Sequence, residues 1–303
     1  MLTVKDRFEA CILAGAIGDA WGSSYENAQP ANPATYYWGQ PPAPSGKWEL
    51  TDDTQLTLAA CEALQHQEMP APEAMVAMML RYYRSGRFSG LGASTLKALQ
   101  ELSVGAHWSQ AGRTGEYAAG NGAAMRIAPY AFLPVYARET VRDICRITHR
   151  NDEAYVGALA VVLSIRAALD GTWDGSNDLL ALLLPQLPDT SVRDRLLLLQ
   201  EKDAAFSIAD AARLGTNGYV VNSVPLAVFA ASRVAQTGMH AMFEAVIGAG
   251  GDTDTNAAIA GQIAGALTGT TGLPATLLQQ LQALPEYGWL QQVLNNTTKL
   301  LFN

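Results

Sequence analysis

The stretch Gly250-Gly251-Asp252-Thr253-Asp254-Thr255 leads directly into a run of small residues, and the rest of the chain is organised around this junction. The glycine pair allows the backbone unusual dihedral angles. On a regular helix Asp252 and Asp254 would point to nearly opposite faces, so they can converge on one ion only from a turn or from the first helical residues. A helix N-terminus suits them because its free N–H groups favour negative charge. The competing interpretation is an ordinary helix cap, since Asp and Thr are good capping residues.

A second segment with the same chemistry, Thr51-Asp52-Asp53-Thr54, occurs about 200 residues earlier. It precedes a helix predicted over residues 54–67, so its oxygen groups also fall at a helix N-terminus. The recurrence favours a built ion site over two unrelated caps. Carboxylate and hydroxyl ligands without His or Cys select hard divalent cations.

Composition predicts a large buried core and excludes some classes of partner. The hydrophobic fraction is 49% and the charged fraction is 16%, which is below a globular average of roughly 25%. The net charge of −8 argues against binding to the phosphate backbone of DNA or RNA. The three cysteines, Cys11, Cys61 and Cys145, are far apart in the sequence and predict neither disulfides nor a zinc site.

No targeting or membrane segment is recognisable in the sequence. The first residues lack the apolar run of a signal peptide, and the nearest candidate for a membrane span, residues 257–278, is made of small residues with Gln262 among them. We therefore expect a cytoplasmic protein without a membrane partner.

The spacing of apolar residues predicts an all-α protein, because helical periodicity recurs along the chain and no stretch alternates as a strand would. No linker divides the chain, and we expect one domain over residues 1–303. Residues 27–50 are rich in proline and aromatic residues, which predicts a structured loop or lid, because its Trp38 and Trp48 need a surface on which to pack. Helices are expected over residues 3–17, 54–67, 72–85, 92–103, 123–128, 139–170 with a break near 148–153, 222–236, 240–248 and 256–267. Residues 176–213 show an amphipathic pattern, and residues 275–303 are expected to form one or two amphipathic helices.

Three further features are weak signals individually. Residues 110–122 form a glycine-rich turn before a predicted helix, and such a turn can cradle an anion, although Gly-Asn-Gly is more often only a turn. His149 lies at the break in a long helical stretch, where a structural role is the commoner outcome. Glu26 lies in a predicted loop, where a lone glutamate is usually a solvated charge.

Taken together and in order, five segments resemble the ADP-ribosylglycohydrolase family. The segments are Gly18-Asp19-Ala20-Trp21-Gly22 with Glu26, Thr51-Asp52-Asp53-Thr54, Gly120-Asn121-Gly122-Ala123-Ala124-Met125-Arg126, Thr148-His149 and Gly250-Gly251-Asp252-Thr253-Asp254-Thr255. They span residues 15–267, which is nearly the whole chain. The resemblance implies a single-domain orthogonal helical bundle with two divalent ions, Mg²⁺ or Mn²⁺, at the bottom of a cleft.

The resemblance also implies roles for individual residues. The implied metal ligands are Glu26, Thr51, Asp52, Asp53, Asp252, Asp254 and Thr255, with Glu26 and Asp53 as catalytic residues. The implied substrate-binding residues are Asp19, Gly120, Asn121, Gly122, Met125, His149, Tyr219 and Gly251.

The activity implied by the resemblance is hydrolysis of the glycosidic bond between ADP-ribose and a modified side chain, with arginine favoured and serine as an alternative. The partner would be an ADP-ribosylated protein or a small-molecule conjugate. Two other functions stay open from the sequence. One is a family member that binds ADP-ribose or a nucleotide without turnover, and the other is a metal-dependent phosphohydrolase acting on the pyrophosphate.

Overall fold

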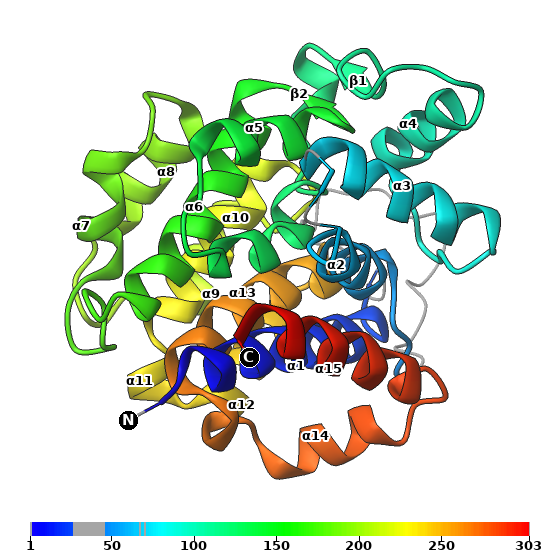
Figure 1. Ribbon diagram of the computed structural model, residues 1–303. Helices are drawn as coiled ribbons and strands as arrows, with labels where there is room; N and C mark the ends of the chain where they lie inside the picture. Colours follow the sequence, from blue (N-terminus) through cyan, green and yellow to red (C-terminus); the bar gives the residue numbers. More distant parts are fainter. Residues whose placement is uncertain (1, 27–45, 67, 70, 303) are drawn as a thin grey trace, which may run out of the picture.

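The computed structural model describes residues 2–26, 46–66, 68–69 and 71–302. Within these residues the protein is a bundle of α-helices, and its strands are the two-residue segments β1 (Arg113–Thr114) and β2 (His149–Arg150), which pair in parallel (Figure 1). The predicted all-α class is confirmed.

The helices follow one another along the described chain with short connections. In order they are α1 (Val4–Ser23), α2 (Asp52–Ala63), α3 (Ala71–Arg84), α4 (Ala93–Ser103), α5 (Arg138–Arg146), α6 (Asp152–Leu169), α7 (Leu179–Leu183), α8 (Ser191–Gln200), α9 (Ile208–Ala212), α10 (Val220–Ser232), α11 (Val234–Thr237), α12 (Met239–Gly248), α13 (Thr253–Thr268), α14 (Ala275–Gln282) and α15 (Tyr287–Phe302). Short 3₁₀ turns are η1 (Glu116–Ala118), η2 (Ala124–Arg126), η3 (Ala128–Phe132), η4 (Leu184–Gln186) and η5 (Thr270–Gly272).

The pair α1 and α13 forms the centre of the bundle, and small residues let the two backbones come close together. A Cβ atom on Gly18 of α1 would lie 2.3 Å from the Ala257 carbonyl oxygen, and one on Gly261 of α13 would lie 2.3 Å from the Ala14 carbonyl oxygen. Real Cβ atoms do not approach so closely, so only glycine fits at these contacts. The pairing brings the C-terminal half of α1, with Asp19, beneath the N-terminus of α13.

The other helices cover this central pair. Helices α6, α10 and α12 pack on α13, α2 contacts both central helices, and α15 packs on α1 and α2 (Figure 1). Helix α6 is apolar nearly all round and is buried along most of its length, as expected for a helix inside the core. The N-terminus of α2 lies beside that of α13, because the Thr255 hydroxyl at the start of α13 donates to Asp53 at the start of α2.

Several local predictions differ from the structure: α1 continues to Ser23, α2 spans Asp52–Ala63, and the stretch 176–213 is divided among α7, η4, α8 and α9. Residues 123–128 form η2 and the start of η3 instead of an α-helix; Ala128 precedes Pro129, and the residue before a proline disfavours α-helical dihedral angles. Helix α10 begins at Val220, two residues before the predicted start, so Pro225 lies beyond its first turn.

The predicted loop or lid over residues 27–50 is described only at its C-terminal end. There, Trp48 stacks on Trp21 of α1 with the ring centroids 6.1 Å apart. Residues 27–45, including Trp38, lie outside the described residues. Among the described helices, none has the length and apolar character that crossing a bilayer requires.

Candidate metal centre and cleft

The N-terminus of α2 supplies one half of the candidate centre. Thr51 is the N-cap of this helix, and its hydroxyl donates to Asp19 Oδ1 at 2.6 Å. Asp53, in the first turn, is 2% exposed, and its Oδ2 accepts a hydrogen bond from the Thr255 hydroxyl at 3.1 Å. The other oxygen, Asp53 Oδ1, is buried and has no hydrogen-bond partner among the described residues. A buried carboxylate oxygen without a hydrogen-bond partner is suited to coordinate a cation.

The N-terminus of α13 supplies the other half. Asp252 occupies the N-cap position, but its side chain makes no capping hydrogen bond. Its Oδ2 instead accepts from the Asn121 side-chain amide at 2.6 Å. Asp254 is 5% exposed, and its Oδ1 accepts from the Thr255 backbone N–H at 2.8 Å. The interpretation of residues 252–255 as a simple side-chain cap therefore does not hold for Asp252.

Carboxylates from both halves converge in two overlapping clusters. One cluster contains Asp19, Asp53 and Asp254, and the other contains Glu26, Asp252 and Asp254; in each, one oxygen per residue lies within 4.8 Å of the others. The clusters share Asp254. Because all the donors are oxygens, the sets fit hard cations such as Mg²⁺ or Mn²⁺.

Burial and mutual repulsion shape the protonation of these carboxylates. The pKa of Asp52 is raised to about 8, mainly by burial and also by the nearby Asp19 and Asp252 carboxylates. Burial is also the largest cause of the raised pKa of Asp53 and of Asp254, followed by neighbouring carboxylates. Without cations, this arrangement disfavours the charged form of each group.

A cleft of about 720 Å³ opens above the carboxylates. Twelve predicted site residues line it: Glu26, Asp52, Asp53, Gly120, Asn121, Gly122, Met125, His149, Gly251, Asp252, Asp254 and Thr255. The volume lies within the range of small-molecule sites.

Three predicted site residues do not line this cleft. Asp19 is fully buried, and its carboxylate accepts from the backbone N–H groups of Thr51 and Thr54 at 3.0 and 3.1 Å, so a direct contact with substrate does not fit its position. Thr51 lies beside it as the cap of α2. Tyr219 is 44% exposed and pairs through its backbone with Gly120; its contact with a substrate stays a prediction.

The turn at residues 120–122 fits around a histidine ring. A Cβ atom on Gly120 would lie 3.0 Å from His149 Nε2, and one on Gly122 would lie 2.9 Å from His149 Cε1. The two glycines thus admit the imidazole. The backbone N–H of Asn121 already donates to the Gly218 carbonyl at 3.1 Å, so this amide does not serve the anion cradle predicted for the turn.

His149 itself is held neutral. It is 4% exposed, and burial lowers its pKa to about 3, with the positive charges of Arg126 and Arg113 contributing in the same direction. Strand β2 places the residue beside Arg113 of β1, since the two are register partners.

Sequence reasoning missed several residues that line the cleft: Gly90, Gly92, Ala93, Ser94, Thr95, Arg113, Asn217 and Gly218. Arg113 is the one cationic side chain among the described lining residues once His149 is neutral. Its position follows from the β1–β2 pairing, and nothing in residues 110–122 alone signals it. Asn217 and Gly218 arrive through the pairing of residues 119–121 with 218–220.

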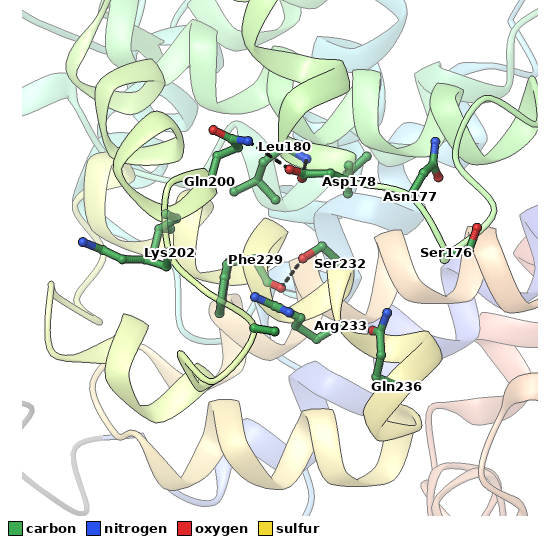
Figure 2. Close-up of a pocket in the computed structure, with 13 residues that line it drawn as sticks. Ser176, Asn177, Asp178, Leu180, Gln200, Lys202, Phe229, Ser232, Arg233 and Gln236 are labelled. Atoms are coloured by element: carbon green, nitrogen blue, oxygen red, sulfur yellow. Dashed lines mark hydrogen bonds between the residues drawn. The ribbon is translucent and has the colours of Figure 1, made fainter.

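A second, smaller pocket of about 260 Å³ lies between the ends of α7, α8 and α10 (Figure 2). Its polar side chains already bond within the protein: Asp178 caps α7 and accepts from Gln200, and Ser232 donates to the Phe229 carbonyl. It contains neither of the carboxylate clusters described above. The larger cleft is therefore the candidate functional site.

Comparisons with known proteins agree with the sequence resemblance. The sequence profile of the family described as ADP-ribosylglycohydrolase matches residues 1–302. The chain is 27% identical to the ADP-ribosylarginine hydrolase Tri1 of Pseudomonas putida, over 91% of this chain and 74% of the relative. It is 25% identical to the ADP-ribosylhydrolase ARH3 of Mus musculus, over 95% and 91% of the two chains. The fold resembles a solved structure titled ADP-ribosylglycohydrolase-related protein complex, with a TM-score of 0.71, 24% identity and 99% of each chain covered.

Proposed function

The chain belongs to the ADP-ribosylglycohydrolase family, and we propose that it is a metal-dependent hydrolase that releases ADP-ribose from a modified side chain. The observation that carries the proposal is the pair of carboxylate clusters that share Asp254 at the cleft. The cleft takes residues from both ends of the sequence, from Glu26 to Thr255, which supports one domain over residues 1–303. Arginine is the favoured attachment site, since the name of one relative specifies ADP-ribosylarginine.

The residues proposed to hold two divalent cations, Mg²⁺ or Mn²⁺, are those of the two clusters together with Asp52, Thr51 and Thr255. The orphaned oxygen of Asp53 supports its place as a ligand. When bound, the ions would supply Lewis-acid chemistry, polarising oxygen ligands and stabilising negative charge. The full burial of Asp19 suits a group that holds the α2 N-terminus and faces an ion better than one that touches substrate.

Glu26 is the proposed acid/base group because its carboxylate is exposed beside Asp252 and Asp254, whereas Asp53 is enclosed. In the proposed reaction the bond from the ribose C1″ to the side-chain atom breaks, and C1″ forms a bond to a water oxygen. Glu26 would take a proton from that water and return one to the leaving atom. Asp53 is then proposed to act as a ligand and not in proton transfer.

Arg113 is proposed to pair with an anionic group of the substrate. Five carboxylates line the cleft, namely Glu26, Asp52, Asp53, Asp252 and Asp254, whereas Arg113 supplies the opposite charge. No ion pair or side-chain hydrogen bond within the described residues occupies its guanidinium. A diphosphate linkage, as in ADP-ribose, offers acceptor oxygens that suit a guanidinium.

The test is to incubate the full chain with peptides ADP-ribosylated at arginine or at serine, with Mg²⁺, with Mn²⁺ or with chelator, and to identify the products by mass spectrometry. The proposal expects free ADP-ribose only when a divalent ion is present. AMP with ribose phosphate would instead identify a phosphohydrolase. Tight ADP-ribose binding without any product would identify a silent binding protein. An Asp53→Asn variant is the control for contaminating activity, and it should release no ADP-ribose.

A further inference from the structure

Arg126 is a fully buried cation without a carboxylate partner among the described residues. It is 0% exposed, and it is absent from the ion pairs that the described side chains form. Its guanidinium donates to the Gly122 carbonyl, to the Ile144 carbonyl at 3.2 Å and to the Thr148 hydroxyl at 2.7 Å. Burying a guanidinium without an anion is unfavourable. The burial of Arg126 at this place therefore calls for an explanation.

The Thr148 hydroxyl connects Arg126 to His149. Its oxygen lies 2.7 Å from His149 Nδ1 and is itself fully buried. A guanidinium can only donate hydrogen bonds, so the hydroxyl oxygen accepts from Arg126 and keeps its single proton for another acceptor. His149 Nδ1 is the acceptor in reach. Both groups are satisfied if Nδ1 carries no proton, whereas a protonated Nδ1 would leave the hydroxyl proton without an acceptor.

The opposite edge of the imidazole faces the cleft. His149 Nε2 lies between Gly120 and Gly122, which both line the cleft together with His149. No hydrogen bond from a described protein group reaches Nε2. The Gly122 carbonyl accepts from Arg126, so the same guanidinium holds the turn on one side of the ring and Thr148 on the other.

We infer that Arg126 and Thr148 are positioning residues that fix His149 as the Nε2–H tautomer, so that His149 donates one hydrogen bond to an acceptor oxygen of the bound substrate. In this state His149 is neither a general base nor a metal ligand at its cleft-facing nitrogen. The identity of the ligand, a ribosyl or phosphoryl oxygen of ADP-ribose, rests on the proposed function. The tautomer does not rest on it.

The first test is direct and needs no substrate. The full chain is labelled with ¹⁵N at the histidine imidazoles, and long-range ¹H–¹⁵N spectra are recorded at neutral pH. The signals of His149 are those that disappear in a His149→Gln variant. The expected pattern is a protonated Nε2 and an unprotonated Nδ1. An Nδ1–H tautomer or an imidazolium would overturn the inference.

The second test changes the hydroxyl while keeping the side-chain shape. Thr148→Val removes the donor to Nδ1, and we expect its His149 signals to show a shifted or mixed tautomer and kcat/KM for ADP-ribose release to fall about tenfold, the size of one lost hydrogen bond. Thr148→Ser keeps the hydroxyl and should stay within about threefold of the wild type with an unchanged spectrum. If Val and Ser variants have the same spectrum and rate, Thr148 does not position His149.

The two proposals fail in different ways. If the wild type releases no ADP-ribose while the spectrum shows the Nε2–H tautomer, the proposed function fails and the positioning role stands. If ADP-ribose is released while the spectrum shows Nδ1–H, the reverse holds. Should Thr148→Val fail to fold, Thr148→Ala also removes the hydroxyl and takes its place in both measurements, and the wild-type spectrum still decides the tautomer.

Discussion

The metal-free protein should become less stable as the pH rises from 4 to 8, and Asp52 should account for a defined share of the loss. The pKa of Asp52 is raised from 3.8 to about 8 in the fold, first by burial and then by the neighbouring carboxylates. Between these values the folded state keeps a proton that the unfolded state has released. The stabilisation is therefore complete below pH 3.8 and is lost as the pH rises through about 8.

The magnitude follows from the linkage between protons and folding. One group with a raised pKa lowers the free energy of unfolding by about 1.4 kcal/mol for each pH unit within its window. Between pH 5 and pH 7, Asp52 alone then removes about 3 kcal/mol. Asp53 and Asp254 have raised pKa values from the same causes, so the loss in the wild type should be steeper. Two ions bound only to the native state oppose it, by about 2.7 kcal/mol per site at 100 times Kd.

The assay is urea unfolding in chelator at pH 5, 6, 7 and 8, repeated with Mg²⁺. Asp52→Asn keeps the shape and loses the titration, so its pH dependence should be shallower than that of the wild type and it should be more stable at pH 7 in chelator. The control Asp189→Asn lies on the surface, with a side chain 93% exposed, and should follow the wild type. An Asp52→Asn variant with wild-type pH dependence would refute the reasoning.

Three other predictions address catalysis, substrate charge and packing. Glu26→Gln should lower kcat by several orders of magnitude and leave ADP-ribose affinity within about tenfold; equal losses would make Glu26 only a ligand. Arg113→Gln should weaken ADP-ribose binding about tenfold and make it less sensitive to salt, and unchanged affinity in calorimetry would remove Arg113 from the substrate site. Gly261→Ala should destabilise the protein by at least about 2 kcal/mol, because the new Cβ meets the Ala14 carbonyl. The control is Gly288→Ala in α15, where the added Cβ has no atom within 4 Å, and it should stabilise the protein by about 0.5 kcal/mol. If Gly261→Ala leaves the melting temperature unchanged, the packing argument is contradicted.

Much of the fold could be predicted because the signals are local. Helical periodicity located most helices, and the polar residues before 54 and 253 marked two N-termini that the structure has at Thr51 and Asp252. The errors arose where a local rule was overridden. The predicted helix at residues 123–128, which ends before Pro129, is replaced by 3₁₀ turns, and the short parallel pairing of β1 with β2 has too few residues for alternation to reveal it.

The site was predictable only to the extent that its residues share a motif. The acidic residues at 52–53 and 252–254 could be recognised because the same Asp and Thr pattern occurs at two predicted helix starts. Arg113, Asn217 and Gly218 carry no such signal, because they reach the cleft through pairings between segments far apart in sequence. Such pairings leave no local pattern from which they could be predicted in a single sequence.

Asp19 shows how the packing of the core and the chemistry of the cleft depend on each other. Its carboxylate, on α1, accepts hydrogen bonds from the backbone N–H groups of Thr51 and Thr54 and so ties α1 to the start of α2, while glycines bring α1 close against α13. Those bonds hold the start of α2 against the start of α13, which is where Asp53 and Asp254 meet. The repulsion among these buried carboxylates opposes that same contact. The close packing of α1 on α13 therefore lies beneath the cluster whose repulsion would push the two helix ends apart, and bound cations would turn that repulsion into attraction.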